Sequence, residues 1–305
     1  MADIGRMLPN EKPEHPYVPF SYAGSMFGNF ATRFCSGCGY GIIGQLFTKI
    51  FEDEKLDPHL YPTIIGIGCY SQLLLIVHTQ SQKILALHGR APALATGIKM
   101  ANPNMKPIIF SGDGDCLGIG GNHFIHLCRR NLDCVIFIFN NSIYAMTGGQ
   151  GAPTTLFGAQ STTTPYKMFE NRSDGVKLAL AAGATYVART TVAHPRTFMK
   201  YFKKGLQHKG TSVIEVITPC VTYFGRKNLN SLGVENTEIE GEKMDTGQKM
   251  IDWIKQNTIR RNQANLMTED QLLNKYVIGE FRYQTDKPEY SDEYIKIQKF
   301  AMEEK

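Results

Sequence analysis

Short runs of apolar residues alternate with longer amphipathic stretches through the first two thirds of the chain. The apolar runs are nearly continuous and rich in Ile, Val and Phe, as in parallel strands that are buried on both faces. We predict strands over Thr63–Gly68, Pro107–Ser111, Val135–Asn140, Thr185–Ala188 and Ser212–Thr218. We predict helices over Tyr40–Asp53, Ala91–Ala101, Ile119–Arg130, Gly175–Ala182 and Pro195–Gln207. This alternation predicts an α/β fold with a doubly wound, mostly parallel sheet.

The alternation stops after residue 228. The remaining segment contains one amphipathic stretch, Lys249–Asn257, and then a polar tail. We therefore expect an N-terminal extension at residues 1–30, one α/β domain at 31–228, and a C-terminal appendage at 229–305 that contacts another subunit. The composition of the tail leaves partial disorder as an alternative.

The composition is that of an ordinary soluble protein, with 42% hydrophobic and 20% charged residues among 305. The net charge of +5 is mild, and it favours an anionic small ligand or an acidic partner over a nucleic acid. Residues 58–82 and 134–166 lack charged side chains, but their Pro, Gly, Gln and Asn residues argue against a lipid-facing helix. The N-terminus lacks the apolar core of a signal peptide. We expect a cytoplasmic protein that binds neither nucleic acid nor membrane.

The chain has seven cysteines, two of which, Cys35 and Cys38, form a C-x-x-C motif. That spacing lets two thiolates reach one metal atom or one cluster, and a structural zinc site or a thioredoxin-like pair are the alternatives. A cluster needs four ligands, and there is no second C-x-x-C. Cys69 and Cys220 are the best candidates for the other two, because each follows a predicted strand and ligands gather at the carboxyl ends of parallel strands.

The other three cysteines point to structural roles. Cys128 lies on a predicted helix and Cys134 opens a predicted strand, so both are expected to be buried thiols. Cys116 lies inside a glycine-rich loop, and we expect a small core residue there.

That loop belongs to residues 107–121, PIIFSGDGDCLGIGG, an apolar strand followed by glycines and a helix. Glycines let the backbone approach a phosphate and offer it N–H groups. The carboxylate of Asp113 or Asp115 would repel a phosphate unless a divalent cation lay between them, and Mg²⁺ binds such a mixture of carboxylate and phosphate oxygens. The loop predicts a metal–diphosphate site, although a simple turn would use the same residue types.

The next predicted strand ends in Asn140 and Asn141, with one helix and one strand between them and Gly114. Such a crossover brings the ends of two parallel strands side by side. The side-chain oxygen of Asn141 and the carbonyl oxygen of Ile143 can then join Asp113 around one Mg²⁺. A GDG motif followed at this distance by NN resembles the thiamine diphosphate-binding signature.

Further motifs narrow the resemblance to the β subunits of 2-oxoacid:ferredoxin oxidoreductases. They are CSGCG at 35–39, IGCYS at 67–71, HGRAPALATGI at 88–98, NNSIYAMTGGQGAPTT at 140–155 and TPC at 218–220. GAQSTTTPY at 158–166, AAGATYVAR at 181–189 and AHPRTF at 193–198 resemble the 2-oxoglutarate branch. The resemblance spans roughly residues 30–228 and implies the diphosphate-binding module of the thiamine diphosphate-binding fold.

The resemblance also implies roles for individual residues. The positions that hold one [4Fe–4S] cluster are Cys35, Cys38, Cys69 and Cys220. The Mg²⁺ ligands are Asp113, Asn141 and the carbonyl of Ile143. The positions that line thiamine diphosphate are Ile67, Gly68, Cys69, Tyr70, Gly112, Gly114, Asp115, Ala145, Met146 and Thr147. His88 matches a catalytic histidine beside cofactor and substrate, whereas its neighbours alone would favour a histidine that caps a turn.

The implied activity is the coenzyme A-dependent oxidative decarboxylation of a 2-oxoacid on thiamine diphosphate, with electrons passing through the cluster to ferredoxin. The expected substrate is 2-oxoglutarate, which gives succinyl-CoA. Pyruvate or a branched-chain 2-oxoacid stays open, because Gln72 stands where the family commonly has a basic residue that meets a substrate carboxylate.

In this family thiamine catalysis also uses a Glu beside the aminopyrimidine ring, on a second α/β module, whereas the strands predicted here are enough for one sheet only. We expect an α subunit to supply it in a heterodimer. Two other classes stay open. A non-redox thiamine diphosphate-dependent decarboxylase subunit would not need four thiolates, and a zinc-stabilised binding protein would not need GDGD or NN.

Overall fold

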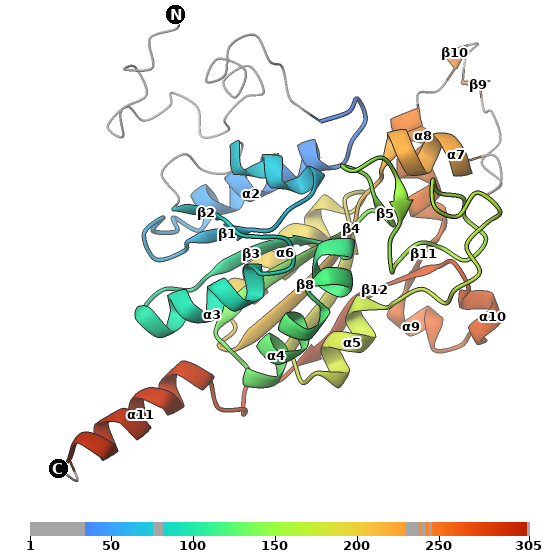
Figure 1. Ribbon diagram of the computed structural model, residues 1–305. Helices are drawn as coiled ribbons and strands as arrows, with labels where there is room; N and C mark the ends of the chain where they lie inside the picture. Colours follow the sequence, from blue (N-terminus) through green and yellow to red (C-terminus); the bar gives the residue numbers. More distant parts are fainter. Residues whose placement is uncertain (1–33, 76–81, 230–237, 240–241, 244–245, 304–305) are drawn as a thin grey trace, which may run out of the picture.

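The computed structural model describes residues 34–75, 82–229, 238–239, 242–243 and 246–303. Its centre is an eight-stranded sheet with the order β11-β12-β7-β8-β4-β3-β1-β2 (Figure 1). Neighbouring strands are parallel, except that β12 runs antiparallel to β7. The predicted α/β fold with a mostly parallel sheet is confirmed. The N-terminal extension predicted for residues 1–30 lies outside the described residues.

All five predicted strands are present, and their residues are buried. They are β1 (Thr63–Ile65), β3 (Ile108–Gly112), β4 (Cys134–Asn140), β7 (Tyr186–Thr191) and β8 (Thr211–Ile217). The predicted helices are α2 (Tyr40–Asp53), α3 (Ala91–Ala101), α4 (Gly121–Arg130), α5 (Gly175–Ala181) and α6 (Pro195–Gln207). Helix α4 begins two residues later than predicted, because a π-helical turn, η3 (Gly114–Ile119), precedes it.

Helices cover both faces of the sheet, so the core has two layers. Phe47 of α2 packs on one face against Phe110 of β3 and Phe202 of α6, with ring centroids 4.3 and 4.6 Å apart. Phe124 and Leu127 of α4 are fully buried on the other face, together with residues of α3 and α5. Figure 1 shows α3, α4 and α5 together on the near side of the sheet. This packing explains why the strands are apolar on both sides.

Several elements of the structure have no predicted counterpart. Strand β2 (Lys83–Leu85) extends the sheet beyond β1. A 3₁₀ segment, η2 (Cys69–Leu75), follows β1, and a small hairpin joins β5 (Ile143–Tyr144) to β6 (Gln150–Gly151). A π-helical turn, η4 (Val221–Gly225), follows Cys220. The last three of these elements carry or flank predicted site residues.

The segment after residue 228 is structured as well. It contains α8 (Thr246–Gln256), β11 (Thr258–Arg260), α9 (Arg261–Ala264), α10 (Glu269–Leu272), β12 (Tyr276–Tyr283) and α11 (Tyr290–Glu303), and α7 (Arg226–Asn228) precedes it. A two-stranded ribbon, β9 (Glu238–Ile239) with β10 (Glu242–Lys243), lies between α7 and α8. Strand β12 pairs with β7, so this segment extends the central sheet, while α11 projects from the body (Figure 1). The division of the chain into domains stays a prediction. Among the described helices, none has both the length and the apolar character needed to cross a membrane.

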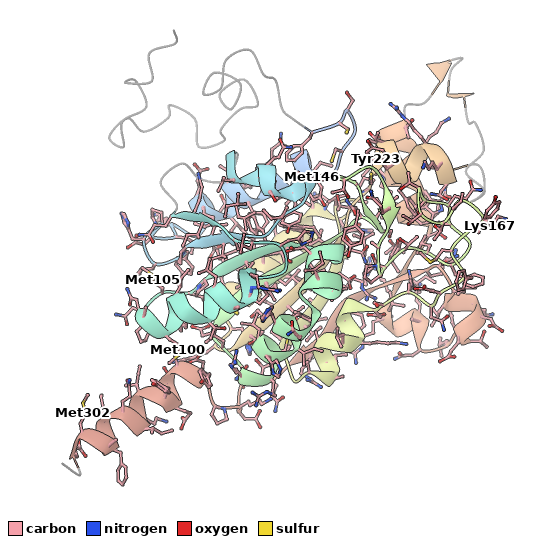
Figure 2. The ribbon with its side chains drawn as sticks, in the orientation of Figure 1. Met100, Met105, Met146, Lys167, Tyr223 and Met302 are labelled. Atoms are coloured by element: carbon pink, nitrogen blue, oxygen red, sulfur yellow. The ribbon has the colours of Figure 1, made fainter. Side chains whose placement is uncertain are left out.

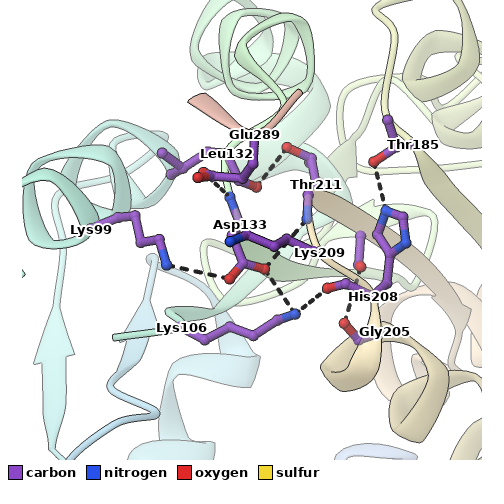
Figure 3. Close-up of polar contacts among 12 residues, drawn as sticks. Lys99, Lys106, Leu132, Asp133, Thr185, Gly205, His208, Lys209, Thr211 and Glu289 are labelled. Carbon is purple, nitrogen blue, oxygen red and sulfur yellow. Dashed lines mark hydrogen bonds and ion pairs between the residues drawn. The ribbon is translucent and has the colours of Figure 1, made fainter. Parts of the chain in front are cut away.

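A buried polar cluster fixes the connections near the amino-terminal ends of the strands (Figure 3). Asp133, just before β4, lies 3.3 Å from Lys99 Nζ and 2.9 Å from Lys106 Nζ. Its backbone N–H donates to Glu289 Oε1 at 2.8 Å. Asp133 therefore ties α3, the entry to β3 and the start of α11 together, and the opposite ends of the strands carry the candidate site.

Candidate active site and cysteine pocket

A pocket of about 460 Å³ lies where β1, β3 and β4 end. It is lined by Tyr40, Ile67, Gly68, Cys69, Tyr70, His88, Gly112, Asp113, Gly114, Asp115, Asn141, Ile143, Tyr144, Ala145, Met146 and Thr147. Every residue predicted to contact thiamine diphosphate or Mg²⁺ is in this set, and so is His88. The structure thus brings these residues together, and their individual roles stay predictions. We call this space the cofactor pocket.

Asp113 directly follows β3 and is 3% exposed. Thr154 Oγ1 donates a hydrogen bond to its Oδ2. Burial raises the pKa of Asp113 to about 7, and no ion pair among the described residues includes this carboxylate. A buried carboxylate without a cationic side chain fits a bound divalent cation, which would supply the missing charge.

Asn141 and Ile143 face the same pocket from the turn after β4. Asn141 Oδ1 accepts a hydrogen bond of 3.2 Å from the Ile143 N–H, and both residues are buried. Carboxylate, amide and carbonyl oxygens are hard donors, which Mg²⁺ prefers. The donor set therefore fits Mg²⁺.

Two glycines of the GDGD loop allow aromatic rings to approach the backbone. A Cβ at Gly112 would lie 2.8 Å from the Tyr70 ring, and one at Gly114 would lie 2.2 Å from the Tyr144 ring. Tyr144 Oη also donates to the Gly114 carbonyl at 3.1 Å. Any larger side chain at these positions would displace a ring that lines the pocket.

Asp115 lines the pocket, but protein groups occupy its oxygens. Tyr70 Oη and the Gly89 N–H each donate to it at 2.7 Å, and Ser111 Oγ donates as well. His88 Nδ1 lies 2.7 Å from Asp115 Oδ1, close enough for an ion pair when the imidazole is protonated, but it is not aligned for a hydrogen bond. Asp115 therefore connects three segments around the pocket, those that carry Tyr70, Gly89 and Ser111.

A second pocket, of about 450 Å³, contains the four cysteines of the predicted cluster. It is lined by Phe34, Cys35, Cys38, Tyr40, Cys69, Gln72, Asn141, Ala145, Pro219, Cys220, Val221, Thr222 and Tyr223. Burial raises the pKa of Cys38 to about 12 and that of Cys69 to about 11, and Cys220 and Cys35 add to both shifts. Thiols whose ionisation is opposed by burial and by neighbouring thiols, as at Cys38 and Cys69, fit a positively charged metal group, since metals bind thiolates.

The described residues include no three Cys, His, Asp or Glu side chains close enough together to hold a single metal ion. A tetrahedral zinc site would bring its sulfur atoms to about 3.8 Å from one another. Within the described part of the chain, the four cysteines thus line one pocket without being drawn together around a single-ion site. We call this space the cysteine pocket.

The glycines of CSGCG bring the first two cysteines to the last one. Gly37 has φ +77°, and a Cβ there would lie 2.6 Å from Gly247 Cα of α8. A Cβ at Gly39 would lie 2.1 Å from Thr218 Oγ1, at the end of β8. Only glycine lets the loop sit this close to β8 and hence to Cys220.

The two pockets share a wall. Tyr40, Cys69, Asn141 and Ala145 line both of them. The shared wall places the cysteine pocket directly beside the cofactor pocket. The other three cysteines, Cys116, Cys128 and Cys134, are fully buried in the core cluster that α3, α4 and α5 cover, and buried positions were predicted for all three.

Tyr40, Tyr144, Thr154 and Tyr223 were not predicted as site residues, although Tyr144 and Thr154 lie within the motif at 140–155. Tyr223 follows Cys220, and its ring lies against Gly149, where a Cβ would be 2.8 Å away. Figure 2 labels Tyr223 and Met146 in the same part of the view, and Met146 belongs to the loop that carries Gly149. That loop is closed by Thr147 Oγ1, which donates to Gln150 Oε1 at 2.6 Å. The contact of Tyr223 with Gly149 joins residues far apart in the sequence, and a short sequence motif cannot reveal such a contact.

Comparisons with known proteins agree with this geometry. Residues 66–216 match the family model "Thiamine pyrophosphate enzyme, C-terminal TPP binding domain". The chain is 45% identical to the 2-oxoglutarate synthase subunit KorB of Methanocaldococcus jannaschii, over 87% of this chain and 92% of that protein. It is 40% identical to the β subunit of 2-oxoacid:ferredoxin oxidoreductase 1 of Aeropyrum pernix, over 62% of this chain and 59% of that protein.

A solved structure is similar over almost the whole chain. It is the 2-oxoglutarate:ferredoxin oxidoreductase from Magnetococcus marinus with 2-oxoglutarate, coenzyme A and succinyl-CoA bound. The match has a TM-score of 0.73 and 27% identity, and it covers 90% of this chain and 88% of the other. The thiamine diphosphate-binding fold, the motifs and these relatives place the chain in one family: it belongs to the β subunits of the 2-oxoacid:ferredoxin oxidoreductases.

Proposed function

We propose that this subunit catalyses the oxidative decarboxylation of 2-oxoglutarate to succinyl-CoA, together with an α subunit, and passes the electrons through a [4Fe–4S] cluster to ferredoxin. The observation that carries the proposal is the wall shared by the cofactor and cysteine pockets. Electrons released at the cofactor would have only this wall to cross. The relatives named for 2-oxoglutarate support the choice of substrate.

Asp113, Asn141 and the Ile143 carbonyl would hold Mg²⁺, which in turn would hold the diphosphate. When bound, thiamine diphosphate would supply a carbanion nucleophile for a keto carbon and an electron sink for the pair left when CO₂ departs. The chain's own residues bind and orient: Asp115 fixes Tyr70 and the Gly89 turn, and the turn presents His88. His88 is one-third exposed, so its ring can hold or move a proton at the mouth of the pocket.

Cys35, Cys38, Cys69 and Cys220 would hold the cluster. Their gathering in one pocket supports this ligand set. Cys69 lines both pockets, which supports direct electron transfer between the two groups.

The α subunit would complete the cofactor pocket. Among the described residues that line this pocket there is no Glu to contact the aminopyrimidine ring. Met146, which lines the pocket, is 48% exposed, and Leu87, next to His88 in the sequence, is 79% exposed. A partner that covered these side chains would also exclude water from the reaction.

Anaerobic co-expression with the α subunit tests the proposal. The purified complex should carry about four irons per β chain with a broad absorption near 400 nm. It should reduce viologen with 2-oxoglutarate and coenzyme A, faster than with pyruvate or branched-chain 2-oxoacids. The β chain alone should be inactive even when it is loaded with iron, Mg²⁺ and thiamine diphosphate. A colourless zinc protein would refute the proposed cluster, and a preference for pyruvate would refute the proposed substrate.

A further inference from the structure

The two asparagines of the NN motif face in different directions. Asn141 lines the cofactor pocket, whereas Asn140 turns away from it and is 5% exposed. Asn140 Nδ2 donates to Glu215 Oε1 of β8 at 2.7 Å. Its Oδ1 accepts from the Ser142 N–H at 3.1 Å and from Ser142 Oγ at 3.3 Å. Asn140 thus ties the turn after β4 to the neighbouring strand.

The Asn140 side chain holds Ser142 through these two hydrogen bonds. Ser142 lies between the two predicted cation ligands, Asn141 and Ile143, and its φ of +62° is in the left-handed region. A residue with a Cβ adopts that conformation only at an energetic cost. The direction of the Ile143 carbonyl relative to the Asn141 side chain depends on this one unusual dihedral.

Glu215 anchors Asn140 from a fixed position. It is 1% exposed, and its Oε2 accepts from Arg189 Nε of β7 at 2.7 Å. Arg189 also pairs with Asp174, whose side chain caps α5. Each carboxylate oxygen of Glu215 therefore has one strong donor, so the side chain cannot rotate without breaking a buried ion pair.

We propose that Glu215 is a positioning residue for the cation site: through Asn140 it holds Ser142 in the left-handed conformation that aims Asn141 and the Ile143 carbonyl at the cation. This rests on the proposed function, since it assumes that Mg²⁺ and thiamine diphosphate bind in the cofactor pocket. Neither Glu215 nor Asn140 touches the cation. Residues that orient metal ligands from behind typically change metal affinity 10–100-fold when they are replaced.

The test is a Mg²⁺ titration of thiamine diphosphate binding to the complex with the α subunit. In Asn140→Ala and in Glu215→Gln, the Mg²⁺ concentration at half-saturation should rise about tenfold or more. Saturating Mg²⁺ should restore thiamine diphosphate binding, and iron content should stay at the wild-type value. Mn²⁺ in place of Mg²⁺ gives a second readout, because its electron paramagnetic resonance spectrum reports the ligand geometry.

Asp174→Asn is the matched control. It changes the far end of the same network and leaves Asn140 and Glu215 paired, so its Mg²⁺ dependence should match wild type even if its melting temperature falls. Wild-type Mg²⁺ dependence in both test variants would overturn the inference, and so would an equal shift in the control. If Asn140→Ala does not fold, Glu215→Gln decides alone, because it keeps the size of the side chain. A wild-type complex that binds no thiamine diphosphate with Mg²⁺ would overturn the proposed function, and this inference with it.

Discussion

Asn141 Nδ2 donates a hydrogen bond of 3.4 Å to the phenolic oxygen of Tyr40, across 101 residues of sequence. Tyr40 is 2% exposed, directly follows the CSGCG motif, and lines both pockets. The bond turns the amide nitrogen of Asn141 towards the cysteine motif. Its oxygen is left for the Ile143 N–H and for a cation. One tyrosine thus connects the segment that carries two of the cysteines to a predicted Mg²⁺ ligand.

Tyr40→Phe should therefore weaken thiamine diphosphate binding in the presence of Mg²⁺ while iron content stays unchanged. A net hydrogen bond contributes about 1 kcal/mol, which corresponds to about fivefold in Kd. Calorimetric titration of the complex measures it. Tyr201→Phe, in the same core cluster but away from both pockets, should bind as wild type does. An unchanged Kd in Tyr40→Phe would show that the bond does not orient Asn141.

Asp113→Ala should abolish Mg²⁺-dependent binding of thiamine diphosphate, because it removes the single carboxylate of the predicted cation site. The cluster should persist, since Asp113 lies outside the cysteine pocket. Asp292→Ala, on the projecting helix α11, is the control. Near-normal cofactor affinity in Asp113→Ala would refute the assignment of the Mg²⁺ ligand.

Cys220→Ser should lower iron per folded chain and block electron transfer to ferredoxin. Cys134→Ser should leave both unchanged, because Cys134 lies in the core on the other face of the sheet. A buried hydroxyl without a partner costs roughly 1–3 kcal/mol of stability in either variant, so iron content rather than stability is the readout. A full cluster in Cys220→Ser together with its loss in Cys134→Ser would overturn the ligand set.

Gly37→Ala should also reduce iron content, although no ligand changes. The left-handed φ of Gly37 costs an alanine roughly 1 kcal/mol, and the new Cβ would lie 2.6 Å from Gly247 Cα, so the loop or α8 must move. Gly97→Ala on α3 is the matched control, with no atom within 4 Å of the new Cβ. It should keep its iron and gain up to about 1 kcal/mol of stability. Equal iron in both variants would contradict the packing of this loop.

His208 should make the fold sensitive to acid. It is 1% exposed, and its Nε2 lies 2.7 Å from Thr185 Oγ1 (Figure 3). Burial, with Lys106 nearby, lowers its pKa to about 4. The folded-state pKa lies below the unfolded value of about 6.5, so protonation favours unfolding. The stability is complete above about pH 6.5 and falls by about 3 kcal/mol as the pH drops to about 4.

Thermal unfolding midpoints across this range check the prediction. His208→Gln cannot be protonated, so its midpoint should fall less between pH 7 and pH 4.5 than that of the wild type. Identical pH profiles would show that other groups control acid unfolding.

The correctly predicted elements are those whose residue pattern lies entirely within the element itself. Buried parallel strands have continuous apolar runs, and α2, α3 and α6 begin and end at the predicted residues. Strand β2 has three residues at an edge of the sheet, with Leu85 half-exposed, so its pattern is too short to recognise. In strand β12, Gly279, Glu280 and Arg282 interrupt the apolar residues, so the run is not recognisable as a buried strand. Arg282 donates hydrogen bonds to backbone carbonyls near α5.

The same division applies to the site. Asp113 and Asn141 directly follow strands, so the topology of a parallel sheet predicts their meeting. The bond of Thr154 to Asp113 spans 41 residues, and that of Glu215 to Asn140 spans 75. Pairings at such separations depend on how the strands are ordered and on the path of the loops. A single sequence contains no pattern that reveals them.

The wall of Tyr40, Cys69, Asn141 and Ala145 makes the two binding events thermodynamically linked. A ligand on either side must order the same four side chains, so the first to bind leaves less conformational entropy to be lost by the second. Linkage is reciprocal. If the cluster raises the affinity for the cofactor, the bound cofactor raises the affinity for the cluster by the same factor, so chelators remove the iron less readily. Oxidative damage to the cluster would then weaken the binding of the cofactor in the neighbouring pocket.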